Sequence, residues 1–207
     1  MKTIVYIDGF NFYYGAVKGT PFKWVDFKKL FQKLLNKSNE ITEIKYFTAI
    51  VSGKYDPTKP SRQKIYLKAL QQFIPEIKIF YGHFLSHEVK APLANSSKKQ
   101  KYAYIIKTEE KGSDVNIAVH LLNDAWLNKY ECAVIVSNDS DLAEAIKLVK
   151  KYHPKKIIGL IHPGRSHPSN ELMKNADFFK RIRTGLLKNS QLPEIIPGTQ
   201  IRKPQNW

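Results

Sequence analysis

Short apolar runs that end abruptly in acidic residues are the main pattern of this chain. The run 3–7 ends at Asp8, and the run 132–136 ends shortly before Asp139 and Asp141. A continuous apolar run is typical of a strand covered on both faces, as in a parallel sheet. Residues 142–149 then carry apolar side chains at helical spacing. The pattern predicts buried parallel strands with acidic turns at their carboxyl ends.

Other periodic stretches predict alternating strands and helices. Asp26 suits the N-cap of a helix whose apolar stripe runs from Phe27 to Leu35, and Ser169 suits the N-cap of a helix over Asn170–Asn175. Further elements are expected at Ile44–Val51, Ser61–Phe73, Ile77–Leu85, Tyr102–Thr108, Ile157–Ile161 and Phe178–Ile182. This alternation predicts an α/β fold class with a central, mainly parallel sheet.

The 207 residues suffice for one domain with a single core, which we expect over residues 1–182. The polar segment 86–101 interrupts the pattern and predicts a flexible insertion, with a short hairpin to Tyr102–Lys107 as an alternative. Its lysines fit either a basic flap over the acidic centre or an ordinary surface loop. Residues 183–207 are expected to form a C-terminal tail, with Leu192, Ile195, Ile196 and Trp207 packed on the domain or on a partner.

Acidic residues from three distant segments are expected to converge. Asp114 follows Lys111-Gly112-Ser113 at a predicted helix start, while Asp8, Asp139 and Asp141 follow strands. The carboxyl ends of parallel strands share one sheet edge, where such folds bind ligands. Converging carboxylates repel unless a cation lies between them, and oxygen ligands favour Mg²⁺ or Mn²⁺. Taken alone, the pair 139 and 141 fits helix capping equally well.

The motifs 6–11 (YIDGFN), 111–114 (KGSD) and 137–141 (SNDSD) together resemble those of NYN domains, members of the PIN-like nuclease superfamily. The resemblance covers roughly residues 3–182. It implies a Rossmann-like three-layer α/β/α fold and a divalent-metal carboxylate centre. It also implies RNA cleavage, although some members of the family are not active nucleases. Asn11 is carried over by the resemblance as an active-site residue.

Several neighbours of the aspartates are candidates for supporting roles. Lys111 is expected to contact a phosphate or to neutralise the acids, and Ser137 is expected to tune the site. Arg165 lies in a Gly/Arg/Ser loop that fits phosphate binding, although Ser169 there also fits a plain helix cap. His120 stands where family members often have another acid, so the number of bound metals, one or two, is left open.

The charge balance favours a polyanionic partner. Lys and Arg number 34 against 18 Asp and Glu, which gives a net charge of +16. Such a field attracts nucleic acid, although a solvated lysine surface gives the same count. Aromatic Tyr13 and Tyr14 suit either the core or stacking on a base. RNA is the expected partner, with a protein partner or a homodimer as further candidates.

Other classes of protein are disfavoured by the sequence. No apolar run approaches the ~20 residues of a membrane helix, and the amino terminus does not resemble a signal peptide. The single cysteine, Cys132, falls in a predicted buried strand, so no intrachain disulfide is expected. We therefore expect a cytoplasmic protein without membrane association. A zinc site is not expected, because no predicted helix carries the histidine pairs 83 and 87 or 162 and 167 and no cysteine supports them.

These observations lead to the hypothesis of a metal-dependent ribonuclease. Asp8, Asn11, Asp114, Asp139 and Asp141 would form the catalytic centre, with the four aspartates as ligands of Mg²⁺ or Mn²⁺. The alternative is a catalytically silent NYN module that binds RNA or protein. A phosphatase with an aspartate nucleophile is a weaker alternative, because Asp8 is followed by Gly9 and Phe10 rather than by a second nearby aspartate.

Overall fold

A six-stranded parallel sheet forms the centre of the computed structural model, which describes residues 1–54, 56–95, 100–164, 166–205 and 207. The strand order is β3-β2-β1-β6-β7-β8, and every neighbouring pair in this sheet is parallel. The strands are β1 (Lys2–Asp8), β2 (Glu40–Thr48), β3 (Ile77–Tyr81), β6 (Cys132–Val136), β7 (Ile157–His162) and β8 (Phe178–Arg181).

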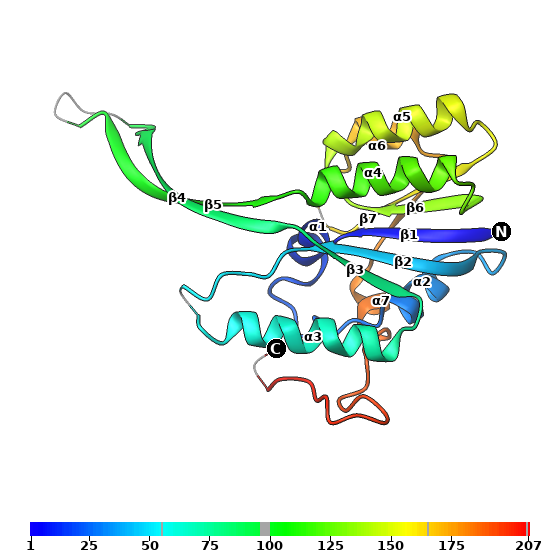
Figure 1. The fold of residues 1–207 in the computed structure, drawn as a ribbon, viewed down its shortest axis with the longest axis horizontal. Helices are drawn as coiled ribbons and strands as arrows, with labels where there is room; N and C mark the ends of the chain where they lie inside the picture. Colours follow the sequence, from blue (N-terminus) through cyan, green and yellow to red (C-terminus); the bar gives the residue numbers. More distant parts are fainter. Residues whose placement is uncertain (55, 96–99, 165, 206) are drawn as a thin grey trace.

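Helices cover both faces of this sheet (Figure 1). One face carries α4 (Ser113–Trp126), α5 (Ala143–Tyr152) and α6 (Asn170–Asn175). The other carries α2 (Phe27–Leu34), α3 (Lys59–Phe73) and α7 (Thr184–Lys188). Short helical turns α1 (Gly9–Phe12) and η1 (Tyr13–Val17) follow β1, and η2 (Ser140–Leu142) follows β6. The predicted three-layer α/β/α fold is therefore confirmed.

Two apolar clusters form the core, one on each face of the sheet. Val5 and Ile7 of β1 point into the cluster with α2 and α3, whereas Ile4 and Tyr6 point into the cluster with α4 and α5. Successive side chains of a strand point to opposite faces. Both faces are covered, so β1 is apolar from Ile4 to Ile7 and β6 is apolar from Cys132 to Val136, as the sequence pattern indicated.

The strand order reverses direction between β1 and β6. From β1 the chain proceeds outward to β2 and β3, and later it returns beside β1 with β6 and proceeds outward to β7 and β8. At such a switch point the connections diverge and leave a crevice outside the carboxyl ends of the strands. Asp8 ends β1, and Ser137 follows β6 on the neighbouring strand.

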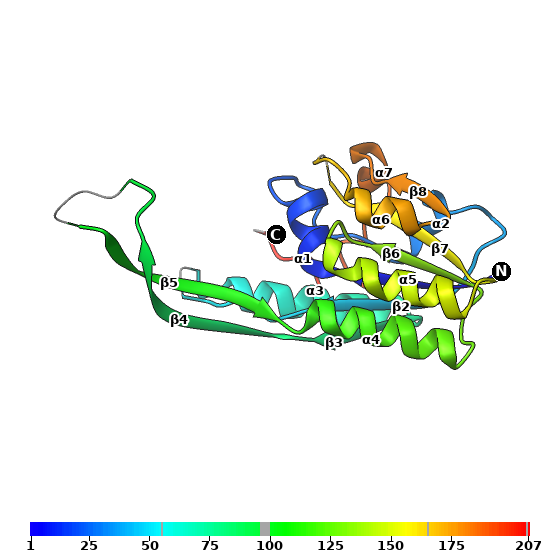
Figure 2. The same ribbon diagram turned by 90° about the horizontal axis from the view of Figure 1, so that it is seen from above.

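A two-stranded ribbon projects from the body (Figures 1 and 2). It pairs β4 (His83–Pro92) with β5 (Tyr102–Lys111) in antiparallel register. The expected single strand 77–85 is wrong, because β3 ends at Tyr81 and β4 begins at His83. Residues 86–92 belong to β4, so the hairpin with Tyr102–Lys107 that the sequence left open is confirmed and is longer than expected. Two of the lysines considered for a basic flap, at positions 98 and 99, lie outside the described residues.

The C-terminal segment packs against the domain. Leu192 and Ile196 are buried in the core, while Ile195 is half exposed. The Trp207 ring lies 5.1 Å from the Tyr66 ring of α3 and 6.1 Å from the Trp24 ring, measured between centroids. The segment that was predicted as a tail thus contributes α7 and core residues to the α2–α3 layer. Within the described residues, no helix has the length and apolarity to cross a membrane.

Candidate active site

Asp8 is the most buried acid of the candidate site, with only 2% of its surface exposed. One carboxylate oxygen accepts a hydrogen bond from the Asn11 main-chain N–H at 2.9 Å. The other accepts from Asn11 Nδ2 at 2.7 Å and from Ser137 Oγ at 2.9 Å. Burial raises the pKa of the Asp8 carboxyl, and the hydrogen bonds from Asn11 and Ser137 oppose that rise.

Hydrogen bonds connect the turn after β6 to Asp8 and to Asn11. The Asp139 N–H donates to Ser137 Oγ at 3.1 Å, and Asp139 caps η2 by accepting from the Asp141 N–H at 3.0 Å. The Asn138 N–H donates to Asn11 Oδ1 at 3.3 Å. Asp139 is partly exposed and Asp141 is exposed. The capping role that the sequence suggested for Asp139 is therefore present.

Asp114 reaches the site from α4. The helix start predicted at this position is confirmed, because Asp114 stands in the first turn of α4, behind Gly112. The strand-like run 102–108 before it belongs to the ribbon and not to the parallel sheet. Burial, followed by the negative charges of Asp8 and Asp139, raises the pKa of Asp114 to about 6. The carboxylates of Glu110 and Asp141 contribute to the same rise.

Residues at the base of the ribbon take different roles. Glu110 accepts a hydrogen bond from Ser113 Oγ at 2.7 Å and lies near enough to raise the pKa of Asp114. Lys111, predicted to contact phosphate or the acids, pairs with Glu109 at 3.1 Å. The other candidate for phosphate binding, Arg165, lies outside the described residues.

His120 belongs to a different polar group, away from the four aspartates. Its Nδ1 lies 3.3 Å from Lys45 Nζ, and its ring packs 4.2 Å from that of Phe80, between centroids. Burial and the charge of Lys45 lower the pKa of His120. Asp124, on the next turn of α4, is fully buried and accepts from Lys45 Nζ at 2.5 Å. We therefore assign His120 to this buried polar group.

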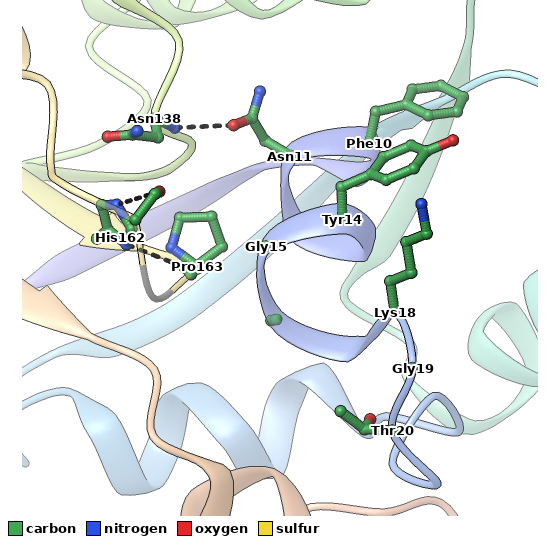
Figure 3. A pocket seen from close by; sticks show the side chains of 13 residues that line it. Phe10, Asn11, Tyr14, Gly15, Lys18, Gly19, Thr20, Asn138, His162 and Pro163 are labelled. Atoms are coloured by element: carbon green, nitrogen blue, oxygen red, sulfur yellow. Dashed lines mark hydrogen bonds between the residues drawn. The ribbon is translucent and has the colours of Figure 1, made fainter.

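A cleft of about 700 Å³ opens beside the acids, between η1 and the loop after β7 (Figure 3). Asn11 and Asn138 line it at the end nearest Asp8. Tyr14 lines its other side with 59% of its surface exposed, and Lys18 Nζ lies 4.5 Å from the centroid of the Tyr14 ring. Charge and an exposed ring therefore stand at the mouth of the acidic centre. Tyr14 was one of two tyrosines for which the sequence left core and stacking roles open.

The acidic edge can be tested for its fit to a metal ion. Within the described residues, no three Asp, Glu, His or Cys side chains are arranged so that they could hold a metal ion together. The donor set nevertheless suits a hard divalent cation, because it consists of carboxylate oxygens. The charges that act most strongly on Asp114 are those of other carboxylates, and a cation would relieve their repulsion. The residues therefore fit Mg²⁺ or Mn²⁺ by chemistry, at an open edge.

The parallel sheet, its two helical layers and the acids at its switch point define a Rossmann-like α/β/α domain of the PIN-like class. A family model described as the NYN domain matches residues 2–183, and the chain belongs to this family. The resemblance carried by the three sequence motifs is thus confirmed. At family level, NYN domains group with the PIN-like nucleases.

Two individual proteins add to this comparison. The chain is 34% identical over 236 aligned residues to a Pseudomonas putida protein named 6-hydroxy-3-succinoylpyridine 3-monooxygenase HspA, and the match covers 100% of this chain and 75% of the relative. A crystal structure of a protein of unknown function from Vibrio parahaemolyticus is similar with a TM-score of 0.54 at 17% identity. That match covers 92% of this chain and 96% of the other, and it shows the fold alone.

Proposed function

We propose that this chain is a metal-dependent ribonuclease that hydrolyses RNA phosphodiester bonds at the acidic edge, with Mg²⁺ or Mn²⁺ as cofactor. The observation that carries the proposal is the crowding of Asp114, whose pKa burial and the charges of Asp8 and Asp139 raise to about 6. Carboxylates gathered at a switch point need a cation to remain ionised together. Membership of the NYN family supports the same class of reaction.

Asp8, Asp114, Asp139 and Asp141 would hold the metal, which supplies a more acidic bound water and stabilises charge at the phosphate. The protein's own contribution is to fix the ligands. Asn11 and Ser137 hold the Asp8 carboxylate through both of its oxygens. The hydrogen bond from the Asn138 main chain to Asn11 couples this arrangement to the turn after β6.

The cleft beside the acids is suited to a single strand of RNA. Tyr14 offers an exposed ring on which a base can stack, and Lys18 beside it offers charge for the adjoining phosphate. The overall charge of +16 would draw the polyanion to this surface. In this arrangement the aspartates would hold the metal, while Tyr14 and Lys18 in the cleft would hold the base and the phosphate.

The proposal is tested by the cleavage of end-labelled single-stranded RNA with Mn²⁺, with Mg²⁺ and with EDTA. We expect cleavage that requires the metal and is lost in Asp139→Asn. Glu144→Gln is the matched control, because Glu144 lies five residues further along, has a side chain 73% exposed and loses the same charge. Cleavage that persists in EDTA or in Asp139→Asn would contradict the proposal.

A negative cleavage result remains informative when binding is measured on the same samples. Salt-sensitive RNA binding without turnover, equal in the unmodified protein and in Asp139→Asn, would assign the chain to the silent RNA-binding type of NYN module. Absence of both cleavage and binding would remove RNA as the substrate. The two measurements therefore separate the nuclease from the module that only binds.

The identity to HspA favours a second candidate function, the oxidation of a small hydroxylated pyridine acid. The relative is matched over the whole of this chain at 34% identity, whereas the family model fixes only the class of domain. The test is incubation of the purified protein with 6-hydroxy-3-succinoylpyridine under air with an added reductant, followed by mass spectrometry. Consumption of this compound, with labelled RNA left intact, would replace the ribonuclease proposal.

A further inference from the structure

A second cavity of about 300 Å³ lies beneath the aromatic segment that follows Asp8. It is bounded by α1 and η1, by α3, by the base of the ribbon and by Trp207. Its volume is at the small end of the range for ligand pockets, roughly 300–1,000 Å³. This cavity is distinct from the cleft in Figure 3, although Phe10 and Tyr14 line both.

Aromatic rings from four parts of the chain line this cavity. Tyr46 comes from β2, Tyr66 from α3 and Phe84 from β4, while Trp207 lies near the C-terminal end. Tyr66 and Trp207 pack against each other at 5.1 Å between centroids. Rings of this kind stack on planar aromatic ligands at distances of ~4.5–7 Å. The walls therefore suit a flat, single-ring molecule.

The cations in the cavity lining indicate that a ligand bound there would carry a negative charge. Lys23, Lys59 and Arg62 belong to the lining, and none of the described lining residues is acidic. Arg62 donates to Asp56 at 2.7 Å through one of its nitrogens, so other donors of its guanidinium are left for a ligand. Burial, with the positive charges of Arg62 and Lys203, lowers the pKa of Lys23. An anion here would relieve that repulsion.

One buried donor at the cavity has no partner. Nε1 of Trp207 is buried and makes no hydrogen bond to any described residue. A buried N–H without a partner is costly, but this atom has almost no accessible surface, so the contact assigned to a ligand is with the indole ring and not with Nε1. The other polar groups nearby are already engaged, since Tyr66 Oη donates to the Val25 carbonyl and the Gln63 amide bonds to Val51 and Ala49.

We propose that this cavity binds a small planar aromatic carboxylate, with its ring between Tyr66, Phe84 and Trp207 and its carboxylate at Arg62 and Lys23. The assignment rests on the lining alone and not on hydrolysis at Asp8. A negative RNA cleavage assay would therefore not contradict the proposed binding site. Likewise, a negative binding experiment at this cavity would not contradict the nuclease proposal. If the second candidate function holds, this cavity is where its substrate would lie.

The test is isothermal titration calorimetry with 6-hydroxynicotinate as the probe, at about 150 mM NaCl to screen non-specific attraction. We expect saturable binding with one site per chain, weakened about tenfold or more in Arg62→Gln because a charged hydrogen-bond donor is lost. Lys68→Gln is the matched control, since Lys68 is an exposed cation on the same helix, outside the cavity lining. Binding in Lys68→Gln should equal that of the unmodified protein.

Two further titrations identify the chemistry that is recognised. 6-Hydroxynicotinamide, which has the ring without the negative charge, should bind about tenfold or more weakly than the acid. Adenosine 5′-monophosphate should not compete, and if it bound in place of the acid, the cavity would be a nucleotide site and the proposal would fail. Trp207→Phe keeps one aromatic ring but loses the larger indole, so weakened binding there, with an unchanged melting temperature, supports a contact between the ligand and the indole ring.

Some results would overturn the proposal directly. One such result is the absence of any heat of binding in the unmodified protein. The other is an equal affinity in Arg62→Gln, in Lys68→Gln and in the unmodified protein. Arg62 is partly exposed, with 23% of its side chain accessible, so its replacement should leave the fold intact. Circular dichroism of each variant verifies that point before titration.

Discussion

The carboxylate of Asp8 is held by Asn11 and Ser137 before any ligand is considered. Both side chains and the Asn11 main chain donate to it, at distances of 2.7–2.9 Å. A buried carboxylate without such donors would be strongly destabilised. Asn11 also accepts from the Asn138 main chain, so one side chain orients the acid and ties it to the neighbouring strand end.

Replacing Asn11 by alanine should therefore reduce both stability and cleavage. Asn11→Ala removes the bond to Asp8 at 2.7 Å and the bond from Asn138 at 3.3 Å, but keeps the main-chain donor. We expect a loss of about 1.5–3 kcal/mol in the free energy of unfolding, as for hydrogen bonds to charged groups. Urea denaturation measures it. Asn175→Ala, which loses only a surface bond to the Glu171 carbonyl, should change it little.

A second buried carboxylate, Asp124, gives a prediction about pH. Burial opposes its ionisation, but the hydrogen bonds from Lys45 and Tyr6 and the charge of Lys45 hold its pKa below the ordinary value of 3.8. A lowered folded-state pKa contributes stability that is present above the unfolded-state pKa and is lost as pH falls through the folded-state pKa. Asp124→Asn should cost about 3–5 kcal/mol near neutral pH, because buried Lys45 loses its nearest carboxylate and keeps only Glu43 at 3.8 Å.

The difference between the unmodified protein and Asp124→Asn should then shrink below about pH 4, because Asp124 takes up a proton in the unfolded chain at a higher pH than in the folded state, where its pKa is lowered. Urea denaturation at several pH values measures this. Glu171→Gln, which affects only exposed ion pairs, should alter stability by no more than about 1 kcal/mol. A difference between the unmodified protein and Asp124→Asn that stayed constant down to pH 3 would show that the charge of Asp124 does not stabilise the fold.

At the scale of elements, the sequence predicted most reliably those parts that are buried on both sides. The strands β1 and β6 are apolar along almost their whole length, and the caps at Asp26 and Ser169 are present as expected. The ribbon could not be predicted in this way. Residues of β4 and β5 are mostly exposed on both faces, so neither strand shows the alternation of a half-buried sheet.

The same limit explains why the run before Asp114 was not recognised as part of a separate ribbon. The run 102–108 resembled a strand of the sheet, and only its pairing with β4 reveals a separate ribbon. The periodicity of one segment does not identify the strand with which that segment pairs. The cavity beside Trp207 was equally out of reach, because β2, α3, the ribbon and the C-terminal residue meet only in the folded chain. The sequence could place the acids at strand ends but not the second cavity.

Gly112 should be sensitive to substitution because it starts α4 with a backbone φ of 99°. A side chain there would meet no atom closer than 3.9 Å, so the penalty comes from the left-handed conformation itself. Gly112→Ala should cost about 1–2 kcal/mol and displace Asp114, lowering cleavage. Gly185→Ala is the contrasting variant, since Gly185 lies in α7 with open space around it and alanine favours helix. Melting temperatures that fell equally in both variants would contradict this explanation.

For the whole molecule, a small acidic centre lies at one edge of the sheet within a strongly basic chain. The acids gather at the carboxyl edge, within a chain of net charge +16. The long-range field brings RNA to any basic face, whereas the cleft beside Asp8 places Lys18 and the exposed Tyr14 ring next to the acids. Lys37, by contrast, is an exposed lysine just before β2, at the amino edge.

These two lysines allow specific and general attraction to be separated. RNA binding should weaken steeply between about 50 and 200 mM NaCl, because each phosphate contact with a single strand contributes about −0.7 to the slope of log K against log salt. Lys18→Gln should reduce the steepness by about that amount, since Lys18 lies beside the Tyr14 ring in the cleft. Lys37→Gln removes the same charge at the far edge of the sheet and should leave the slope unchanged. Equal slopes for both variants, measured by fluorescence anisotropy with a labelled RNA, would mean that RNA is held by the general field and not in the cleft.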